Sequence, residues 1–74
     1  MAKTQMRLAN RAWRTETRSR GWDRGWKGGR KAWKKFCREN AAWMVADAIA
    51  NHDDIADQRD ANGRVAEELT YWGD

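Results

Sequence analysis

The residues with the most capacity for chemistry in this sequence are tryptophans that stand among cations. Residues 20–23 (Arg-Gly-Trp-Asp) are followed at once by 24–27 (Arg-Gly-Trp-Lys), and 11–14 (Arg-Ala-Trp-Arg) is echoed by 31–34 (Lys-Ala-Trp-Lys). An indole can stack on a nucleic-acid base while neighbouring cations neutralise phosphates, and each stacked base contributes roughly 1–3 kcal/mol. The glycines let the backbone approach an anion closely. This pattern favours contact with nucleic acid.

Trp22 and Trp26 are the best candidates for direct contact with a partner, because they lie in a glycine-rich segment with charged neighbours. Trp13 and Trp33 fall on apolar helical stripes and are expected in the core, and Trp43 lies inside an apolar run and is expected in the core or an interface. Trp72 either closes the core or anchors another chain. The candidate partner-binding surface is Arg11, Arg14, Arg18, Arg20, Trp22, Arg24, Trp26, Lys27, Arg30, Lys31, Lys34 and Lys35.

The charge of the chain divides sharply after Arg38, although the net charge of the whole is only +4. Residues 1–38 hold thirteen bases and two acids, a net charge of +11, whereas residues 39–74 hold two bases and nine acids, a net charge of −7. Such asymmetry indicates either an anionic partner for the first half or an association of oppositely charged halves. It also disfavours a role on a membrane surface, because anionic lipid would repel the acidic half.

Catalytic and metal-binding arrangements find little support in the sequence. Cys37 lies on an apolar stripe and is expected to be a small core residue, and the single histidine, His52, comes after the far end of the same helix. Asp53, Asp57 and Asp60 share a helical face, but an acidic helix start, which the helix dipole favours, explains them. We therefore expect no enzyme activity, no catalytic or metal-ligating residue and no cofactor.

The elements that must position these residues are helices, as the absence of proline and the apolar periodicity indicate. Within residues 1–20, apolar side chains recur at helical spacing at Ala2, Met6, Ala9 and Trp13. The stripe then reaches polar residues such as Thr17, so 15–20 is expected to be an exposed helical extension. Residues 21–29 contain four of the six glycines and are expected to form a loop without regular helix.

Residues 30–51 are expected to form the central helix. Its apolar stripe is Trp33, Phe36, Cys37, Ala41, Met44 and Ala48, and the run at 41–50 is apolar almost all round, which is typical of a helix with several neighbours. Asp53 or Asp54 suits the N-cap of an acidic helical segment over 54–72. Asn62-Gly63 falls inside this segment and is expected to break or kink it between 54–61 and 64–72.

These elements predict an all-α fold, a small single-domain bundle of three to four helices over residues 1–74 with a Gly/Trp-rich loop between the first two long helices. One unpaired cysteine indicates a reducing, cytoplasmic setting. No apolar run in residues 1–20 fits a signal peptide, and no stretch approaches the roughly 20 apolar residues that span a bilayer.

Three functions are consistent with this sequence. The first is a non-enzymatic module that binds nucleic acid, or a nucleoprotein complex, through the basic Trp/Arg-rich surface. The second is a protein inhibitor or adaptor that uses Trp and Arg hot spots, since the chain resembles in size and composition the small host-modulating proteins that bacteriophages encode. The third is an architectural subunit that oligomerises, as a homodimer for example, by pairing basic and acidic halves.

Overall fold

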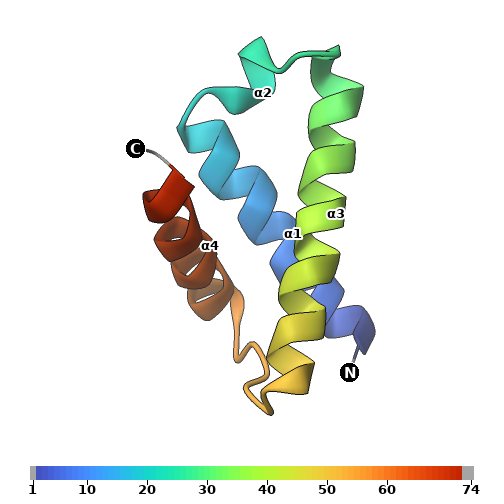
Figure 1. Cartoon of the computed structure of the whole chain (residues 1–74), viewed down its shortest axis with the longest axis vertical. Coiled ribbons are helices and arrows are strands. Elements are labelled where there is room, and N and C mark those ends of the chain that lie inside the picture. Colours follow the sequence, from blue (N-terminus) through green and yellow to red (C-terminus); the bar gives the residue numbers. More distant parts are fainter. Residues whose placement is uncertain (1, 73–74) are drawn as a thin grey trace.

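The computed structural model describes residues 2–72 and contains four helices over that range. They are α1 (Ala2–Ser19), α2 (Trp22–Gly25), α3 (Gly29–Ala50) and α4 (Gln58–Trp72), and no strand lies among the described residues (Figure 1). The expected all-α fold of three to four helices is therefore confirmed. Met1 and the side chain of Ala2, both in the first expected helix, lie outside the described residues. None of the helices within 2–72 combines the length and apolarity needed to cross a bilayer.

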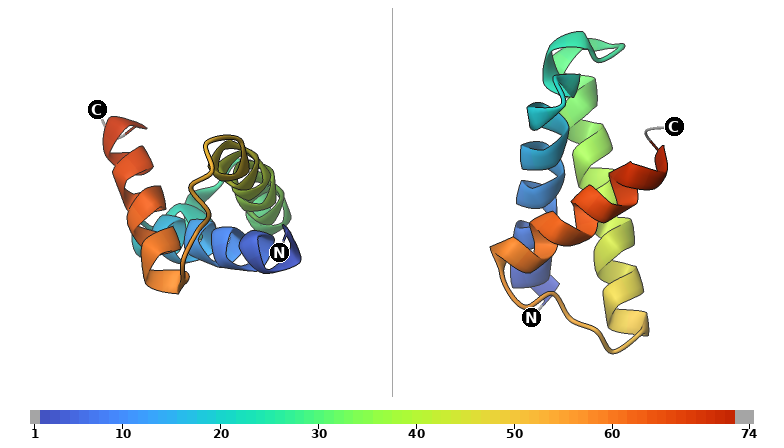
Figure 2. Two further views of the ribbon diagram at one scale, coloured as in Figure 1. Left: turned by 90° about the horizontal axis from the view of Figure 1, so that it is seen from below. Right: turned by 90° about the vertical axis from the view of Figure 1, so that its left-hand side faces the viewer.

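The central element is α1, which packs against each of the other three helices. Seen along the long axis in Figure 2, α1 forms a base from which α3 and α4 rise on two sides. No described Cα atom of α3 lies within 8 Å of one in α4. A helix forms over Gly29–Ala50, close to the expected 30–51, but the expectation that it is the central helix is wrong. Its apolar second half has too few neighbours, and it leaves Ile49 49% exposed and Trp43 77% exposed. Trp43 is thus not a core residue.

The core forms where a stripe of buried side chains on α3 and another on α4 pack against the buried side chains of α1. The buried apolar set is Ala9, Ala12, Trp13, Trp33, Cys37, Ala41, Val45, Ala48, Ile55, Ala61, Val65 and Leu69. Five of these are alanines, which let the helices approach closely, and the two tryptophans supply the bulk that a chain of this length needs. The predicted core positions of Trp13, Trp33 and Cys37 are confirmed. Phe36 and Met44 lie half-buried against this core.

The end of α1 differs from the expected exposed extension. The helix does continue to Ser19, but Thr17 is fully buried. Its Oγ1 accepts a hydrogen bond from Trp33 Nε1 at 2.8 Å and donates one to the carbonyl oxygen of Trp13 at 2.6 Å. A periodicity of apolar residues does not detect this position, because the buried side chain is polar and is placed by hydrogen bonds.

The segment 21–29 contains a helical turn, α2, where no regular helix was expected. Gly21 (φ 79°) precedes the turn and Gly28 (φ 93°) precedes α3, and both lie in the left-handed region that favours glycine. A Cβ atom at Gly28 would also lie 2.9 Å from the Cβ of Ala32. Between these glycines Trp22 packs against Trp26 and Phe36, so aromatic contacts hold the turn to α3.

The last helix begins at Gln58, four residues later than expected. Asp57 is its N-cap in place of Asp53 or Asp54, because Asp57 Oδ1 accepts the N–H of Asp60 at 2.8 Å. The residues before it are non-helical, and Ile55 among them is buried. The side-chain amide of Gln5 on α1 holds the backbone of Ile55 with two hydrogen bonds. Its Oε1 accepts the Ile55 N–H and its Nε2 donates to the Ile55 carbonyl, each at 2.8 Å.

The expected break at Asn62-Gly63 is also wrong, since α4 runs without interruption from Gln58 to Trp72. Burial of Ala61, Val65 and Leu69 along one side stabilises a continuous helix. Gln58 Nε2 donates to Asn62 Oδ1 at 2.9 Å, which supports the turn before the glycine. These contacts outweigh the roughly 1 kcal/mol that a glycine inside a helix costs.

Candidate functional site

A row of arginines covers the outer side of α1. Arg7, Arg11, Arg14 and Arg18 follow one another at i, i+4, i+7 and i+11, so they share one side of the helix. At 3.6 residues per turn this side lies about 130° around the helix axis from Trp13, which is buried. Arg7 and Arg11 are exposed, whereas Arg14 is half-buried and Arg18 lies over the ring of the buried Trp33.

A second row of cations lies on the first half of α3, which packs on α1. It consists of Lys31, Lys34, Lys35 and Arg38, all exposed. The guanidinium carbon of Arg18 lies 5.6 Å from the ring centroid of Trp33, which brings the α1 row against α3. Trp33 lies in the same part of α3 as the Lys31 to Arg38 row, and α3 packs on α1. We call these eight residues the basic face.

The cations of the basic face are not neutralised by the protein. The ion pairs among the described residues join Arg20 to Glu16 and Arg64 to Asp53 and Asp60. No residue of the basic face has a described carboxylate oxygen within the 4.0 Å of an ion pair. The positive charge of the face is therefore available to an anion in solution.

The predicted surface residues divide into those on the basic face and those at the α2 end of the molecule. Arg11, Arg14, Arg18, Lys31, Lys34 and Lys35 belong to the basic face. Arg24, Lys27 and Arg30 are exposed around α2 and the start of α3. Arg20 is exposed but donates to the Glu16 carboxylate at 3.3 Å, so part of its charge is compensated.

Trp22 and Trp26 belong to an aromatic cluster. The ring centroids of these two residues lie 5.7 Å apart, and that of Trp26 lies 4.4 Å from Phe36. Trp72 of α4 covers the same cluster, with its centroid 5.6 Å from Trp13 and 6.4 Å from Trp22. Both loop tryptophans are half-buried as a result, so they present less free ring surface than an isolated loop indole would.

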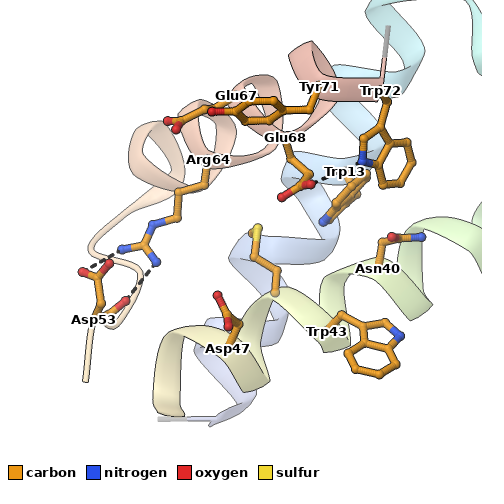
Figure 3. Close-up of a pocket in the computed structure, with 11 residues that line it drawn as sticks. Trp13, Asn40, Trp43, Asp47, Asp53, Arg64, Glu67, Glu68, Tyr71 and Trp72 are labelled. Atoms are coloured by element: carbon orange, nitrogen blue, oxygen red, sulfur yellow. Dashed lines mark hydrogen bonds and ion pairs between the residues drawn. The ribbon is translucent and has the colours of Figure 1, made fainter. Parts of the chain in front are cut away.

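A groove of about 520 Å³ opens on another side of the molecule, between α3 and α4 (Figure 3). Trp13 of α1 lies at its floor, Trp43 and Asp47 are among its α3 residues, and Tyr71 and Trp72 among those of α4. Tyr71 is 74% exposed and Trp72 is 44% exposed. Because α3 and α4 diverge from α1, three large aromatic side chains on these two helices are left without a protein neighbour on one side.

The rim of this groove is acidic. Asp47, Asp53, Glu67 and Glu68 line it, and Arg64 is the lining residue of opposite charge. Arg64 is already engaged, with Nη2 3.3 Å from Asp53 Oδ1 and 3.1 Å from Asp60 Oδ2. The groove therefore carries a net negative charge on a chain whose net charge is +4. We call it the acidic groove.

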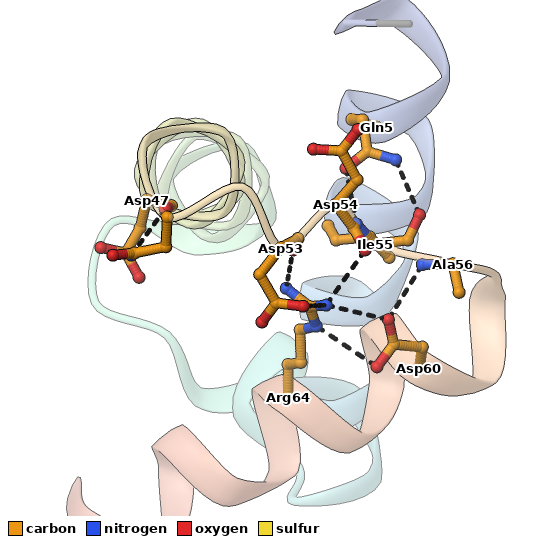
Figure 4. A network of polar contacts seen from close by, with 9 residues as sticks. Gln5, Asp47, Asp53, Asp54, Ile55, Ala56, Asp60 and Arg64 are labelled. Carbon is orange, nitrogen blue, oxygen red and sulfur yellow. Dashed lines mark hydrogen bonds and ion pairs between the residues drawn. The ribbon is translucent and has the colours of Figure 1, made fainter.

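Arg64 is the centre of a polar network that ties the loop 51–57 to α4 (Figure 4). Its Nη1 donates to the Asp53 carbonyl at 2.9 Å and its Nη2 to the Asp54 carbonyl at 3.2 Å. Asp60 accepts the N–H of Ala56 at 2.9 Å as well as the Arg64 guanidinium, and these bonds lower the pKa of its carboxyl. The hydrogen bond to Asp60, together with the charges of Asp60 and Asp53, raises the pKa of Arg64.

The aspartates considered for a metal site are thus committed to structural roles. Asp57 caps α4, while Asp53 and Asp60 bind Arg64. Among the described residues no group of three or more His, Cys, Asp and Glu side chains is placed to hold a metal ion. The acidic residues of this region organise the loop and the helix start.

Cys37 is buried beside the hydroxyl of Thr17, with Sγ 3.7 Å from Oγ1. Burial raises the pKa of this thiol, and the Thr17 hydroxyl and the nearby Arg14 and Arg18 offset only part of that effect. A buried thiol with a raised pKa is a poor nucleophile. The geometry assigns Cys37 to packing.

Several residues of these surfaces were not among the sequence candidates. Arg7 and Arg38 extend the basic face, and Arg7 could have been found from its i, i+4 spacing to Arg11. Trp43 was expected in the core or an interface, and Trp72 was expected to close the core or anchor another chain. The sequence did not separate these alternatives, because the exposure of Trp43 and of Tyr71 beside Trp72 follows from the divergence of α3 and α4.

The chain matches no protein-family model, and no curated protein or solved structure is significantly similar to it.

Proposed function

We propose that this protein binds nucleic acid through the basic face, contacting the phosphate backbone and carrying out no chemical reaction. The observation that carries the proposal is the set of cations in rows on the packed helices α1 and α3, none of which is paired with a described carboxylate. Neutralising phosphates with such cations releases condensed counterions, which is the main source of sequence-independent affinity.

The dimensions of the basic face suit a phosphate backbone. From Arg7 to Arg18 the helix rises about 16 Å, which corresponds to roughly five phosphates along the axis of one strand. The second row, on α3, widens the contact so that more than one line of phosphates can be engaged. The positive charge lies on rigid helices, so little conformational entropy is lost when the partner binds.

Contact with bases has a smaller part in this proposal. Trp22 and Trp26 are half-buried in the aromatic cluster, so their rings support the α2 turn as well as any stacking on a base. Lys and Arg on the outside of two helices recognise phosphate charge more than base identity. The protein therefore binds many sequences with similar affinity, in a reducing cytoplasmic setting that agrees with its single buried thiol.

A matched pair of charge reversals tests the proposal. Arg11→Glu places an acid on the basic face, and Arg59→Glu makes the same change in net charge at an exposed site on α4. Binding of a fluorescent DNA duplex and of a single-stranded RNA, followed by anisotropy, should weaken by about tenfold or more for Arg11→Glu. It should change much less for Arg59→Glu. Equal losses for both variants, or no binding by the wild type, would show that the basic face is not the interface.

A further inference from the structure

The exposed apolar surface of this protein is concentrated at the acidic groove. The large apolar side chains that the structure leaves exposed are Trp43, Ile49, Tyr71 and Trp72, and three of these four line the groove. Exposed aromatic residues gathered in a concave site are typical of a surface that a partner covers. This surface is separate from the basic face, because the groove-lining side of α3 lies about half a turn around the helix axis from the Lys31 to Arg38 row.

The charge of the groove specifies a cationic occupant. Glu67 and Glu68 on α4 and Asp47 on α3 have no described cation within ion-pair distance, while Arg64 is already bound by Asp53 and Asp60. Glu68 accepts a hydrogen bond from Trp72 Nε1 at 3.3 Å but has no cation as a partner among the described residues. Aromatic faces next to such carboxylates attract Lys and Arg side chains through cation–π contacts and charge-assisted hydrogen bonds. An anionic ligand would be repelled from the same place.

The floor of the groove also lacks one hydrogen-bond acceptor. Trp13 is 3% exposed, and its Nε1–H has no partner among the described residues. Figure 3 shows the nitrogen end of this indole turned toward the interior of the groove. A buried donor without an acceptor costs about 1–3 kcal/mol. An occupant that brings a carbonyl oxygen to the floor gains from this donor only if the side chains covering the nitrogen move aside, because the atom itself is buried.

The shape of the groove fits a helix. Its walls are α3 and α4, which both rest on α1 without touching each other, so a further helix between them would complete a four-helix arrangement (Figure 2). The lining part of α4, from Arg64 to Trp72, rises about 12 Å, or roughly two turns. Two turns present apolar side chains at i, i+3, i+4 and i+7 and leave the flanks for charged ones.

A second copy of this chain is the less suitable occupant. Two grooves placed face to face would set Asp47, Glu67 and Glu68 of one copy against the same carboxylates of the other, which is unfavourable. A groove that receives the basic face of another copy would make a head-to-tail contact, which leads to a ring or an open chain of molecules and covers the basic face as well. The like charges of two facing grooves and the covering of the basic face both favour a different protein.

We propose that the acidic groove binds a basic amphipathic helix of a partner protein. Apolar side chains of that helix contact Trp43, Tyr71 and Trp72, and its Lys or Arg side chains pair with Asp47, Glu67 and Glu68. The protein would then hold nucleic acid and a basic protein on two different surfaces. The groove site does not depend on the proposed nucleic-acid contact, and either can fail without the other.

The probe for this proposal is a fluorescent synthetic peptide of about twelve residues, three turns of helix, with Leu at i, i+3, i+4 and i+7 and Lys elsewhere. A second peptide has Glu in place of every Lys. Anisotropy with the full-length protein should show binding of the Lys peptide and none of the Glu peptide. Binding should weaken by about tenfold or more in Tyr71→Ala and in Glu67→Lys, because each removes one of the two kinds of contact.

Two control variants match these changes outside the groove. Ile49→Ala removes another exposed apolar side chain, and Glu39→Lys reverses another exposed acid on α3. Both should bind the Lys peptide as the wild type does, with unchanged circular dichroism in all four variants. The proposal is overturned if the Lys peptide does not bind, or if groove and control variants bind it equally. It is also overturned if the wild type sediments as a dimer that Tyr71→Ala converts to a monomer.

Discussion

Trp33 Nε1 donates a hydrogen bond to Thr17 Oγ1 at 2.8 Å, and this contact joins α3 to α1 inside the core. The same hydroxyl donates to the carbonyl oxygen of Trp13 at 2.6 Å. The Thr17 hydroxyl thus accepts the hydrogen bond of the buried Trp33 N–H on α3 and donates its own hydrogen bond within α1. Because α1 and α3 together carry the basic face, this bond lies within the contact that holds the two helices of that face together.

Thr17→Val should destabilise the protein by about 1–3 kcal/mol. Valine has nearly the shape of threonine but leaves the Trp33 N–H buried without an acceptor. Thr17→Ser keeps the hydroxyl and removes one methyl group, so it should cost about 1 kcal/mol. Urea denaturation followed by circular dichroism measures both. A valine variant as stable as the serine variant would contradict the role assigned to this hydrogen bond.

Two tryptophan truncations should have opposite consequences, although Trp33 and Trp43 lie on the same helix. Trp33 is fully buried, and Trp33→Ala should cost about 3–5 kcal/mol, a large part of the stability of a small domain. Trp43 is 77% exposed, so Trp43→Ala should change the free energy of unfolding by no more than about 0.5 kcal/mol. Thermal melts of both variants test this. A large loss in Trp43→Ala would show that its side chain is covered in solution.

Acid stability should depend on Asp60. The N–H of Ala56 and the Arg64 guanidinium hold the pKa of its carboxyl below the ordinary value of 3.8 in the folded state. A group with a lowered folded-state pKa stabilises the protein above its unfolded pKa, and that contribution disappears as pH falls from about 3.8 through the folded value. Asp60→Asn should therefore flatten the loss of stability in this range. Denaturation midpoints of the wild type and of Asp60→Asn, measured from neutral pH downward, test this. If the midpoints of the two proteins fall in parallel with pH, Asp60 does not have this role.

Sequence periodicity predicted the helices well where burial is apolar. Trp33, Cys37 and Ala41 share a stripe of α3, and that stripe is the one the core uses. It failed where hydrogen bonds decide the structure. Gln5 binds the backbone of Ile55, which is non-helical, and α4 therefore begins at Gln58 and not at residue 54. Such contacts join residues fifty positions apart, so no local pattern contains them.

The surfaces show the same division. The helical spacing of Arg11, Arg14 and Arg18 is enough to place them on one side of α1. The structure adds that α1 packs on α3, which carries the candidates Lys31, Lys34 and Lys35, and that Arg18 lies over Trp33. The apolar run at 41–50 was interpreted as a helix surrounded by others, but α4 diverges from α3 and leaves Trp43 on an open groove. The hydrophobicity of a residue alone does not show whether its side chain is buried in the core or exposed on the surface.

The salt dependence of nucleic-acid binding tests the central proposal most directly. For the wild type and a short mixed-sequence DNA duplex, the logarithm of the association constant should fall with the logarithm of salt concentration at a slope of about −3 or steeper. Arg11→Ala should reduce that slope by about 1, because one phosphate contact is lost, while Arg59→Ala should leave it unchanged. A slope near zero for the wild type, or the same slope for all three proteins, would contradict binding through the basic face.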